Sequence, residues 1–238
     1  MLKIGILDSD HLSPAVIKRY GCYSDQFIKF LSPLQQQHQL EMTFNHYNVF
    51  EKKYPSAIHD NDVYLFTGSQ YSSYDNLDWI HKLQEYVQEL HTNKIKIIGI
   101  CFGHQIIAQS LGGKVAKNKR GWEIGVTATH VVNRMDWMKP VREFFFNLVS
   151  HQDEVIQLPE DAINFVSTNL CEYSGFTIGN HILTFQGHPE FNKQYLKLII
   201  RLQSNHLSTE QRKNARQSLK QSLDTELMRR WIANFIAN

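Results

Sequence analysis

Cys101 stands where the sequence predicts that a buried strand turns into a helix. Residues 96–100 form an apolar run rich in β-branched side chains, which is typical of a fully buried strand. Residues 105–111 have the apolar spacing of a helix. Gly99 and Gly103 flank the cysteine, where a β-carbon would block close packing of the strand on the helix. A strand, a tight turn with a reactive side chain and a helix form the nucleophile-elbow pattern, here with cysteine in place of serine.

This position gives the Cys101 thiol the chemistry of a nucleophile. At a helix N-terminus the helix dipole and the free amides favour the thiolate over the thiol. The amide of Phe102, which follows the cysteine, is placed to bind an oxyanion. The alternative is a buried core cysteine beside a tight turn, because free cysteine is among the most buried residue types. The paired glycines favour the nucleophile, since a core cysteine does not need them.

A cysteine nucleophile needs a base, and the segment 186–190 supplies a candidate directly after a β-rich run. Pro189 restricts His188 to extended conformations. Extended residues two apart point to the same side, so the Glu190 carboxylate can reach the imidazole. A carboxylate on one ring nitrogen leaves the other nitrogen facing the thiol. A turn with an unrelated His and Glu is the alternative, but together with the elbow the pattern predicts a triad of Cys101, His188 and Glu190.

The elements around these residues predict an α/β fold. Strands are expected at 2–8, 40–49 and 63–66, with helices at 23–30 and 76–90 between them and the strand before Cys101. This alternation predicts a mainly parallel central sheet with helices on both faces. Ligands of such sheets bind at the carboxyl ends of the strands, where Cys101 and Gly68 both lie. Taken alone, Gly68 is more typical of an ordinary turn than of a ligand site.

The second half of the chain has a different pattern. Residues 124–132, 164–168 and 176–185 predict shorter, partly antiparallel strands. Residues 208–236 predict a C-terminal helix, because apolar side chains recur at every fourth position behind a capping box. Such a stripe is more typical of a helix packed on its own domain than of one that binds a partner. The sequence contains no linker, repeat or low-complexity tract, so we expect a single domain over residues 1–238.

Composition excludes several classes of protein. The net charge of +2 gives no electrostatic reason to expect a nucleic-acid or anionic-membrane partner. No apolar run approaches the roughly 20 residues that span a bilayer. The 3 cysteines are far apart and form no Cys-x-x-Cys pair, which argues against a disulfide framework and a zinc site. We therefore expect a cytoplasmic protein.

Two of these motifs carry a resemblance to a known family. Residues 99–105, followed by residues 188–190, resemble the class I (triad) glutamine amidotransferases. The most similar members are stand-alone proteins that resemble the glutaminase domain of GMP synthase. The likeness runs from about Asp62 to Glu190. It implies a flavodoxin-like α/β fold with a small, partly antiparallel section and no metal or organic cofactor.

The resemblance also implies a reaction. Cys101 would attack the side-chain amide carbon of glutamine, or the γ-glutamyl amide of a related small molecule. His188 would pass the proton to the leaving ammonia or amine, and Glu190 would orient His188. A γ-glutamyl thioester would form, and water would release glutamate from it.

Further site residues follow from the same resemblance. The amide of Phe102 would form half of the oxyanion hole, and an amide of Gly68 or Ser69 would form the other half. Which of the two donates stays open, because the family commonly has Gly-Gly or Asn-Gly there. The glutamyl end of the substrate would contact four residues, with Glu123 against its ammonium: Gln105, Glu123, Ser150 and His151.

Three functions remain open from the sequence. The first is a self-sufficient hydrolase of glutamine or γ-glutamyl compounds. The second is the glutaminase subunit of a two-part, GMP synthase-like amidotransferase. The sequence has no Gly-x-x-x-x-Gly-Lys-Ser/Thr segment, so ammonia transfer would require a separate synthase as partner protein. The third is a non-catalytic binding protein, which the intact set of Cys101, His188 and Glu190 disfavours.

Overall fold

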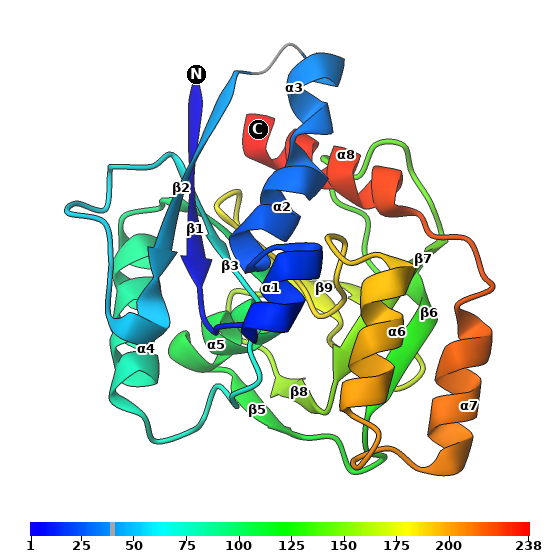
Figure 1. Ribbon diagram of the computed structural model, residues 1–238. Helices are drawn as coiled ribbons and strands as arrows, with labels where there is room; N and C mark the ends of the chain where they lie inside the picture. Colours follow the sequence, from blue (N-terminus) through cyan, green and yellow to red (C-terminus); the bar gives the residue numbers. More distant parts are fainter. Residues whose placement is uncertain (39–40) are drawn as a thin grey trace.

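Strands and helices alternate in the first half of the chain and build a parallel sheet. The computed structural model describes residues 1–38 and 41–238 (Figure 1). The parallel strands are β2 (Met42–Asn48), β1 (Leu2–Asp8), β3 (Val63–Phe66), β4 (Lys96–Ile100) and β11 (Ile182–Phe185), in this spatial order. The strand predicted at 40–49 is therefore confirmed as β2, and residue 40 lies outside the described residues.

The sheet continues beyond β11 with antiparallel strands. These are β10 (Gly175–Ile178), β9 (Ile163–Ser167), β6 (Glu123–Val131) and β7 (Phe144–His151), which complete a nine-stranded sheet in the described part of the chain. A separate antiparallel pair joins β5 (Lys114–Lys117) to β8 (Asp153–Gln157). The predicted α/β fold with a partly antiparallel section is confirmed.

Helices cover both faces of the parallel strands because these strands are buried on both sides. On one face, Ile4 and Leu65 pack in a cluster with α2, α3 and α8. On the other face, Leu7 and Phe66 pack with α4 and α5. These helices are α2 (Tyr23–Leu31), α3 (Pro33–His38), α4 (Asp78–Thr92), α5 (Phe102–Ser110) and α8 (Thr225–Ala237), and a short 3₁₀ turn η1 covers Val49–Glu51. No helix in the two described ranges is long and apolar enough to cross a bilayer.

The C-terminal helix predicted at 208–236 is wrong as one continuous element. The chain forms α7 (Thr209–Ser218) and α8, and the capping box of Ser208 and Gln211 begins α7 as predicted. The break occurs at the edge of β7, where Asp224 N donates to Phe146 O (2.9 Å) and Phe146 N donates to Asp224 Oδ2 (2.8 Å). The two helices bury their apolar stripes in different clusters, so the stripe continues in the sequence although the helix ends.

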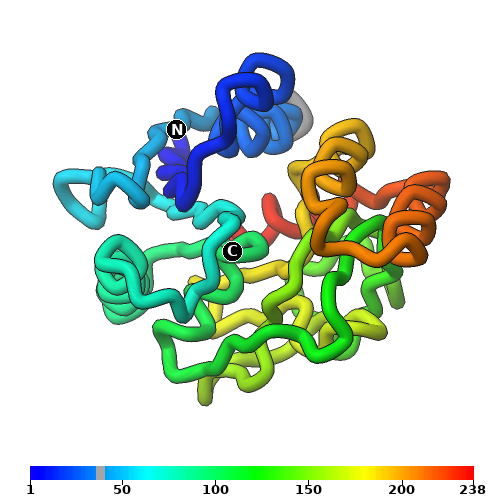
Figure 2. The backbone as a smooth tube through the Cα atoms, turned by 60° about the horizontal axis from the view of Figure 1, so that its bottom comes forward, coloured from blue at the N-terminus to red at the C-terminus, as the bar shows by residue number. Residues whose placement is uncertain are grey.

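Residues 12–20, called the N-terminal segment below, lie beside α6 (Lys193–Leu202), which is far away in the sequence. Figure 1 shows α1 (Pro14–Tyr20) beside α6, and Figure 2 shows the same blue and orange segments next to each other. The Tyr20 hydroxyl donates to Gln194 O (3.4 Å), and the Tyr20 and Tyr195 ring centroids lie 5.1 Å apart. These two segments form one wall of the cavity described below.

Candidate active site

Cys101 occupies the turn between β4 and α5. Its backbone has φ 55° and ψ −104°, a conformation that costs free energy for a residue with a β-carbon. The turn is held by hydrogen bonds on both sides, from Cys101 N to Phe185 O (2.9 Å) and from Gly103 N to Thr67 O (3.1 Å). Strain of this kind persists where the surrounding structure imposes it and is concentrated at functional sites.

The two glycines of the elbow have the steric role that the sequence predicts. A β-carbon on Gly99 would lie 2.5 Å from Ile107 Cδ1 and 2.7 Å from Gly103 O. A β-carbon on Gly103 would overlap the backbone oxygen of Phe66. Side chains at either position would therefore push α5 away from β3 and β4, and the turn that presents Cys101 could not form.

His188 and Glu190 form a buried pair beside the cysteine. The distance from His188 Nδ1 to Glu190 Oε1 is 2.7 Å, and the two side chains are 4% and 0% exposed. His188 N donates to Leu148 O (2.7 Å), which fixes the backbone next to β7. Burial opposes protonation of His188, but the negative charges of Glu190 and Cys101 outweigh it, and the pKa of the imidazole is raised above its ordinary value.

A cavity of about 960 Å³ brings most of the candidate residues together at the carboxyl ends of the parallel strands. Gly68 touches both reactive side chains: a β-carbon there would lie 3.1 Å from His188 Cε1 and 3.8 Å from Cys101 Cβ. The candidate residues that line the cavity are Gly68, Ser69, Cys101, Gln105, Ser150, His151 and His188. Glu190 lies behind His188, and Phe102 begins α5 directly after the cysteine.

The loop that carries Gly68 is fastened to the loop after β1. The Ser69 hydroxyl donates to Ser9 O (3.0 Å), and Ser9 N donates to Thr67 Oγ1 (3.0 Å). The buried carboxylate of Asp10 accepts hydrogen bonds from Gln70 N (2.9 Å) and from Gln70 Nε2 (3.0 Å). Asp10 also lines the cavity, and the sequence carries no motif that marks it.

Gln105 lies in the inner wall of the cavity with its amide nitrogen already engaged. Gln105 Nε2 donates to Asp153 O (2.8 Å) and to Gln186 Oε1 (3.0 Å). The carboxylate of Asp153 accepts hydrogen bonds from Ser72 Oγ (2.5 Å) and from Tyr74 OH (3.2 Å). Asp153 therefore connects Gln105 to the loop after β3, a contact that sequence spacing alone cannot predict.

The resemblance predicts a contact between Glu123 and a substrate ammonium, but Glu123 is not among the residues that line the cavity. The structure puts it behind His151, away from the cavity wall. Glu123 Oε2 is 3.2 Å from His151 Nε2, and the hydroxyls of Thr127 and Thr168 each donate to the carboxylate at 3.1 Å. Burial raises the pKa of Glu123, but the His151 and hydroxyl contacts lower it further than burial raises it. In this geometry the Glu123 carboxylate is engaged by His151 and two hydroxyls, and its contact with a substrate ammonium stays a prediction.

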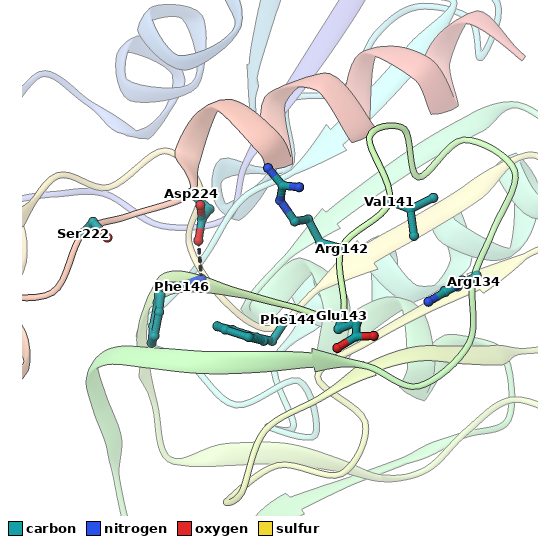
Figure 3. Close-up of a pocket in the computed structure, with 8 residues that line it drawn as sticks. All are labelled: Arg134, Val141, Arg142, Glu143, Phe144, Phe146, Ser222 and Asp224. Carbon is teal, nitrogen blue, oxygen red and sulfur yellow. Dashed lines mark hydrogen bonds between the residues drawn. The ribbon is translucent and has the colours of Figure 1, made fainter.

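A second pocket of about 600 Å³ shares no lining residue with the cavity around Cys101 (Figure 3). Its lining combines exposed apolar side chains with charged ones: Arg134, Val141, Arg142, Glu143, Phe144, Phe146, Ser222 and Asp224. Figure 3 shows the hydrogen bond between Asp224 and the Phe146 amide there. Among the residues that the structure describes, this lining includes no cysteine or histidine.

A strained cysteine at the carboxyl edge of an α/β sheet, beside a buried His–Glu pair, is typical of enzymes that use a cysteine nucleophile. Comparison with known proteins agrees with this class. The chain belongs to the class I glutamine amidotransferase family, whose model matches residues 25–199.

Its relatives include a gamma-glutamyl peptidase and a GMP synthase subunit. Gamma-glutamyl peptidase 3 of Arabidopsis thaliana is 32% identical over 196 residues, which cover 79% of this chain and 76% of that protein. A subunit of the glutamine-hydrolyzing GMP synthase of Sulfolobus acidocaldarius is 32% identical over 130 residues, which cover 54% of this chain and 67% of that protein. The crystal structure of a glutamine amidotransferase from Thermotoga maritima has the same fold, with a TM-score of 0.77 at 16% identity over 100% of this chain and 99% of that one.

Proposed function

We propose that this chain hydrolyses γ-glutamyl amide bonds with Cys101 as the nucleophile. The observation that carries the proposal is that the strained Cys101 and His188 line one cavity, with Glu190 bound to His188 behind it. The Cys101 thiolate attacks the γ-carbonyl carbon, and the C–N bond breaks as His188 gives its proton to the leaving nitrogen. Water then attacks the thioester carbon while His188 takes a proton from the water, the C–S bond breaks, and glutamate leaves with the Cys101 thiolate and protonated His188 restored.

The remaining candidate residues have supporting roles in this reaction. The Phe102 amide and an amide of Gly68 or Ser69 stabilise the oxyanion. Because Gln70 N already donates to Asp10, the second donor is the amide of Gly68 or Ser69. The glutamyl end of the substrate contacts the inner wall at three residues: Gln105, Ser150 and His151.

The size and lining of the cavity favour γ-glutamyl peptides over free glutamine. Beyond the reactive groups, the cavity continues between the N-terminal segment and α6. The lining of this outer part includes the apolar and aromatic side chains of Leu12, Val16, Tyr195 and Ile199 beside polar ones such as Ser13 and Gln203. Ammonia as a leaving group needs no such surface, whereas an amino acid or peptide can bury part of its side chain there. The similarity to gamma-glutamyl peptidase 3 over most of the chain supports the same substrate class.

A glutaminase subunit that delivers ammonia to a separate synthase is the second candidate. The similarity to the GMP synthase subunit of Sulfolobus acidocaldarius supports it, although that similarity covers a smaller part of this chain. In this case the partner protein would make the site fully active, and the isolated chain would hydrolyse glutamine slowly.

Glutamate release by the purified chain distinguishes the candidates. We expect turnover of γ-glutamyl dipeptides to exceed that of glutamine, to disappear in Cys101→Ala and to persist in Cys22→Ala, a matched change at a partly exposed cysteine. Weak turnover of every substrate, with Cys101 still labelled by a glutamine-like electrophile, would instead favour the glutaminase subunit. Undiminished hydrolysis by folded Cys101→Ala would overturn the nucleophile assignment.

A further inference from the structure

The ring of Phe191 lies flat against the imidazole of His188. The two ring centroids are 3.8 Å apart, and the ring planes differ by only 4°. Phe191 is 6% exposed and lines the cavity. Glu190 binds His188 at Nδ1, in the plane of the imidazole, so Phe191 and Glu190 contact different parts of the same ring.

This stacking geometry depends on the charge of the imidazole. Two neutral aromatic rings disfavour strong face-to-face overlap, because the negative faces of their π systems repel. A cation over the face of a phenyl ring is attracted by it, and more strongly when water is excluded. The parallel stack on Phe191 therefore favours the protonated form of His188 over the neutral form.

Phe191 also packs against a second aromatic ring. The Tyr195 ring meets it edge-on, with 4.7 Å between centroids and 80° between planes, and Tyr195 is 3% exposed. Gly68 lies at the Cε1 edge of the imidazole, and a β-carbon added to it would be 3.1 Å from Cε1. The His188 ring is thus bounded by Glu190 at Nδ1, by Gly68 at one edge and by Phe191 on one face.

We propose that Phe191 is a positioning residue of this active site, which fixes the plane of the His188 imidazole and stabilises its protonated form. This inference rests on the proposed function, in which protonated His188 donates to the leaving nitrogen. Other titratable groups also act on this region. The charges of Cys101 and Glu190 act directly on His188. Both also act on Tyr23, as do Asp10 and Tyr195. The test therefore changes Phe191 alone.

The direct measurement is an NMR pH titration of the His188 ring in the full-length protein, assigned by comparison with His188→Gln. In Phe191→Leu we expect the titration midpoint to fall by about 0.5 to 1.5 pH units, since the imidazolium loses its cation–π contact. Phe191→Tyr keeps an aromatic face and should restore the wild-type midpoint. Phe235→Leu is the matched control, because it removes an equally buried ring far along the chain, in α8.

Kinetics provide the second readout. The alkaline limb of the kcat/KM profile should move to lower pH in Phe191→Leu, with kcat reduced about 2- to 30-fold. If Phe191→Leu does not fold, Phe191→Met removes the ring while keeping a long apolar side chain. An unchanged His188 midpoint in a folded variant without the ring overturns the inference, even if the enzyme is active. Absence of Cys101-dependent turnover in the wild type instead overturns the proposed function, whatever the titration shows.

Discussion

Glu190 acts on the proposed reaction only through His188. Its Oε1 binds His188 Nδ1 at 2.7 Å, and its side chain is fully buried behind the imidazole. Removal of Glu190 leaves the nucleophile and the base in place, but without the group that selects the tautomer of His188.

We therefore expect Glu190→Ala to lower kcat by about 10³- to 10⁴-fold, and His188→Ala or Cys101→Ala to lower it by about 10²-fold more. Glutamate release under single-turnover conditions measures the difference. Glu172→Ala, a change at an exposed glutamate, should retain full activity. A folded Glu190→Ala protein as inactive as Cys101→Ala would contradict the orienting role.

Asp8 is a buried carboxyl group at the end of β1 whose ionisation destabilises the fold. Burial raises its pKa from 3.8 to about 6, although Ser24 donates to Oδ2 (2.5 Å) and His46 lies 3.9 Å away. The folded protein therefore binds this proton more tightly than the unfolded chain does. The free energy of unfolding decreases as the pH rises through the window from about 4 to about 6.

Asp8→Asn should remove this pH dependence. The variant is expected to be about 2 kcal/mol more stable than the wild type at pH 7 and close to it at pH 4. Urea unfolding at the two pH values provides the measurement. Asp161→Asn, a change at an exposed aspartate, should alter stability by less than about 0.5 kcal/mol at either pH. Equal stability of Asp8→Asn and wild type at pH 7 would show that the buried carboxylate carries no penalty.

At the scale of elements, Gly103 in the elbow and Gly68 in the loop after β3 differ in what they contribute to stability and to activity. A β-carbon on Gly103 overlaps the backbone of β3, which cannot move without displacing a central strand. A β-carbon on Gly68 would meet side-chain atoms and no backbone: His188 Cε1 at 3.1 Å and Cys101 Cβ at 3.8 Å, on the cavity wall.

Gly103→Ala should therefore lower the free energy of unfolding by about 2–3 kcal/mol and abolish turnover. Gly68→Ala should stay within about 1 kcal/mol of wild-type stability yet lose at least about tenfold in kcat, because His188 is displaced. Urea unfolding and glutamate release on the same preparations test both. Equal stability losses in the two variants would contradict this division.

The elbow could be predicted because all of its requirements are local. An apolar run, two glycines and a cysteine specify the turn within about eight residues. The break between α7 and α8 could not be predicted in the same way. It depends on the pairing of Asp224 with Phe146, residues 78 positions apart, while the apolar stripe continues on both sides.

At the scale of the whole molecule, the parallel and antiparallel parts of the sheet follow from strand length and patterning. Local motifs predict Cys101, His188 and Glu190, and the resemblance to the family adds the second oxyanion donor and the substrate contacts. Positions that depend on folded contacts were not accessible from sequence. The resemblance assigns Glu123 to the substrate site, yet its carboxylate lies against His151. Asp10 reaches Gln70 across 60 positions, and Phe191 gains its role only where its ring meets His188. The single domain over 1–238 and the cytoplasmic location stay predictions.

The outer wall of the cavity is formed by α6 and the N-terminal segment. A mutation in this wall tests the substrate class separately from the chemistry at Cys101. Ile199 projects from α6 into this wall. Ile199→Ala removes apolar surface that the leaving group of a γ-glutamyl peptide would cover, and leaves the inner wall unchanged. We expect kcat/KM for γ-glutamyl-phenylalanine to fall about tenfold and kcat/KM for glutamine to stay within about twofold.

The ratio of the two kcat/KM values is the measurement, because it cancels differences in active fraction between preparations. Ile163→Ala, at a half-exposed isoleucine on β9 that does not line the cavity, should leave the ratio unchanged. A parallel loss for both substrates in Ile199→Ala would mean that the wall supports the active site as a whole. The outer cavity would then give no reason to prefer a γ-glutamyl peptide over glutamine, and the glutaminase subunit would become the better proposal.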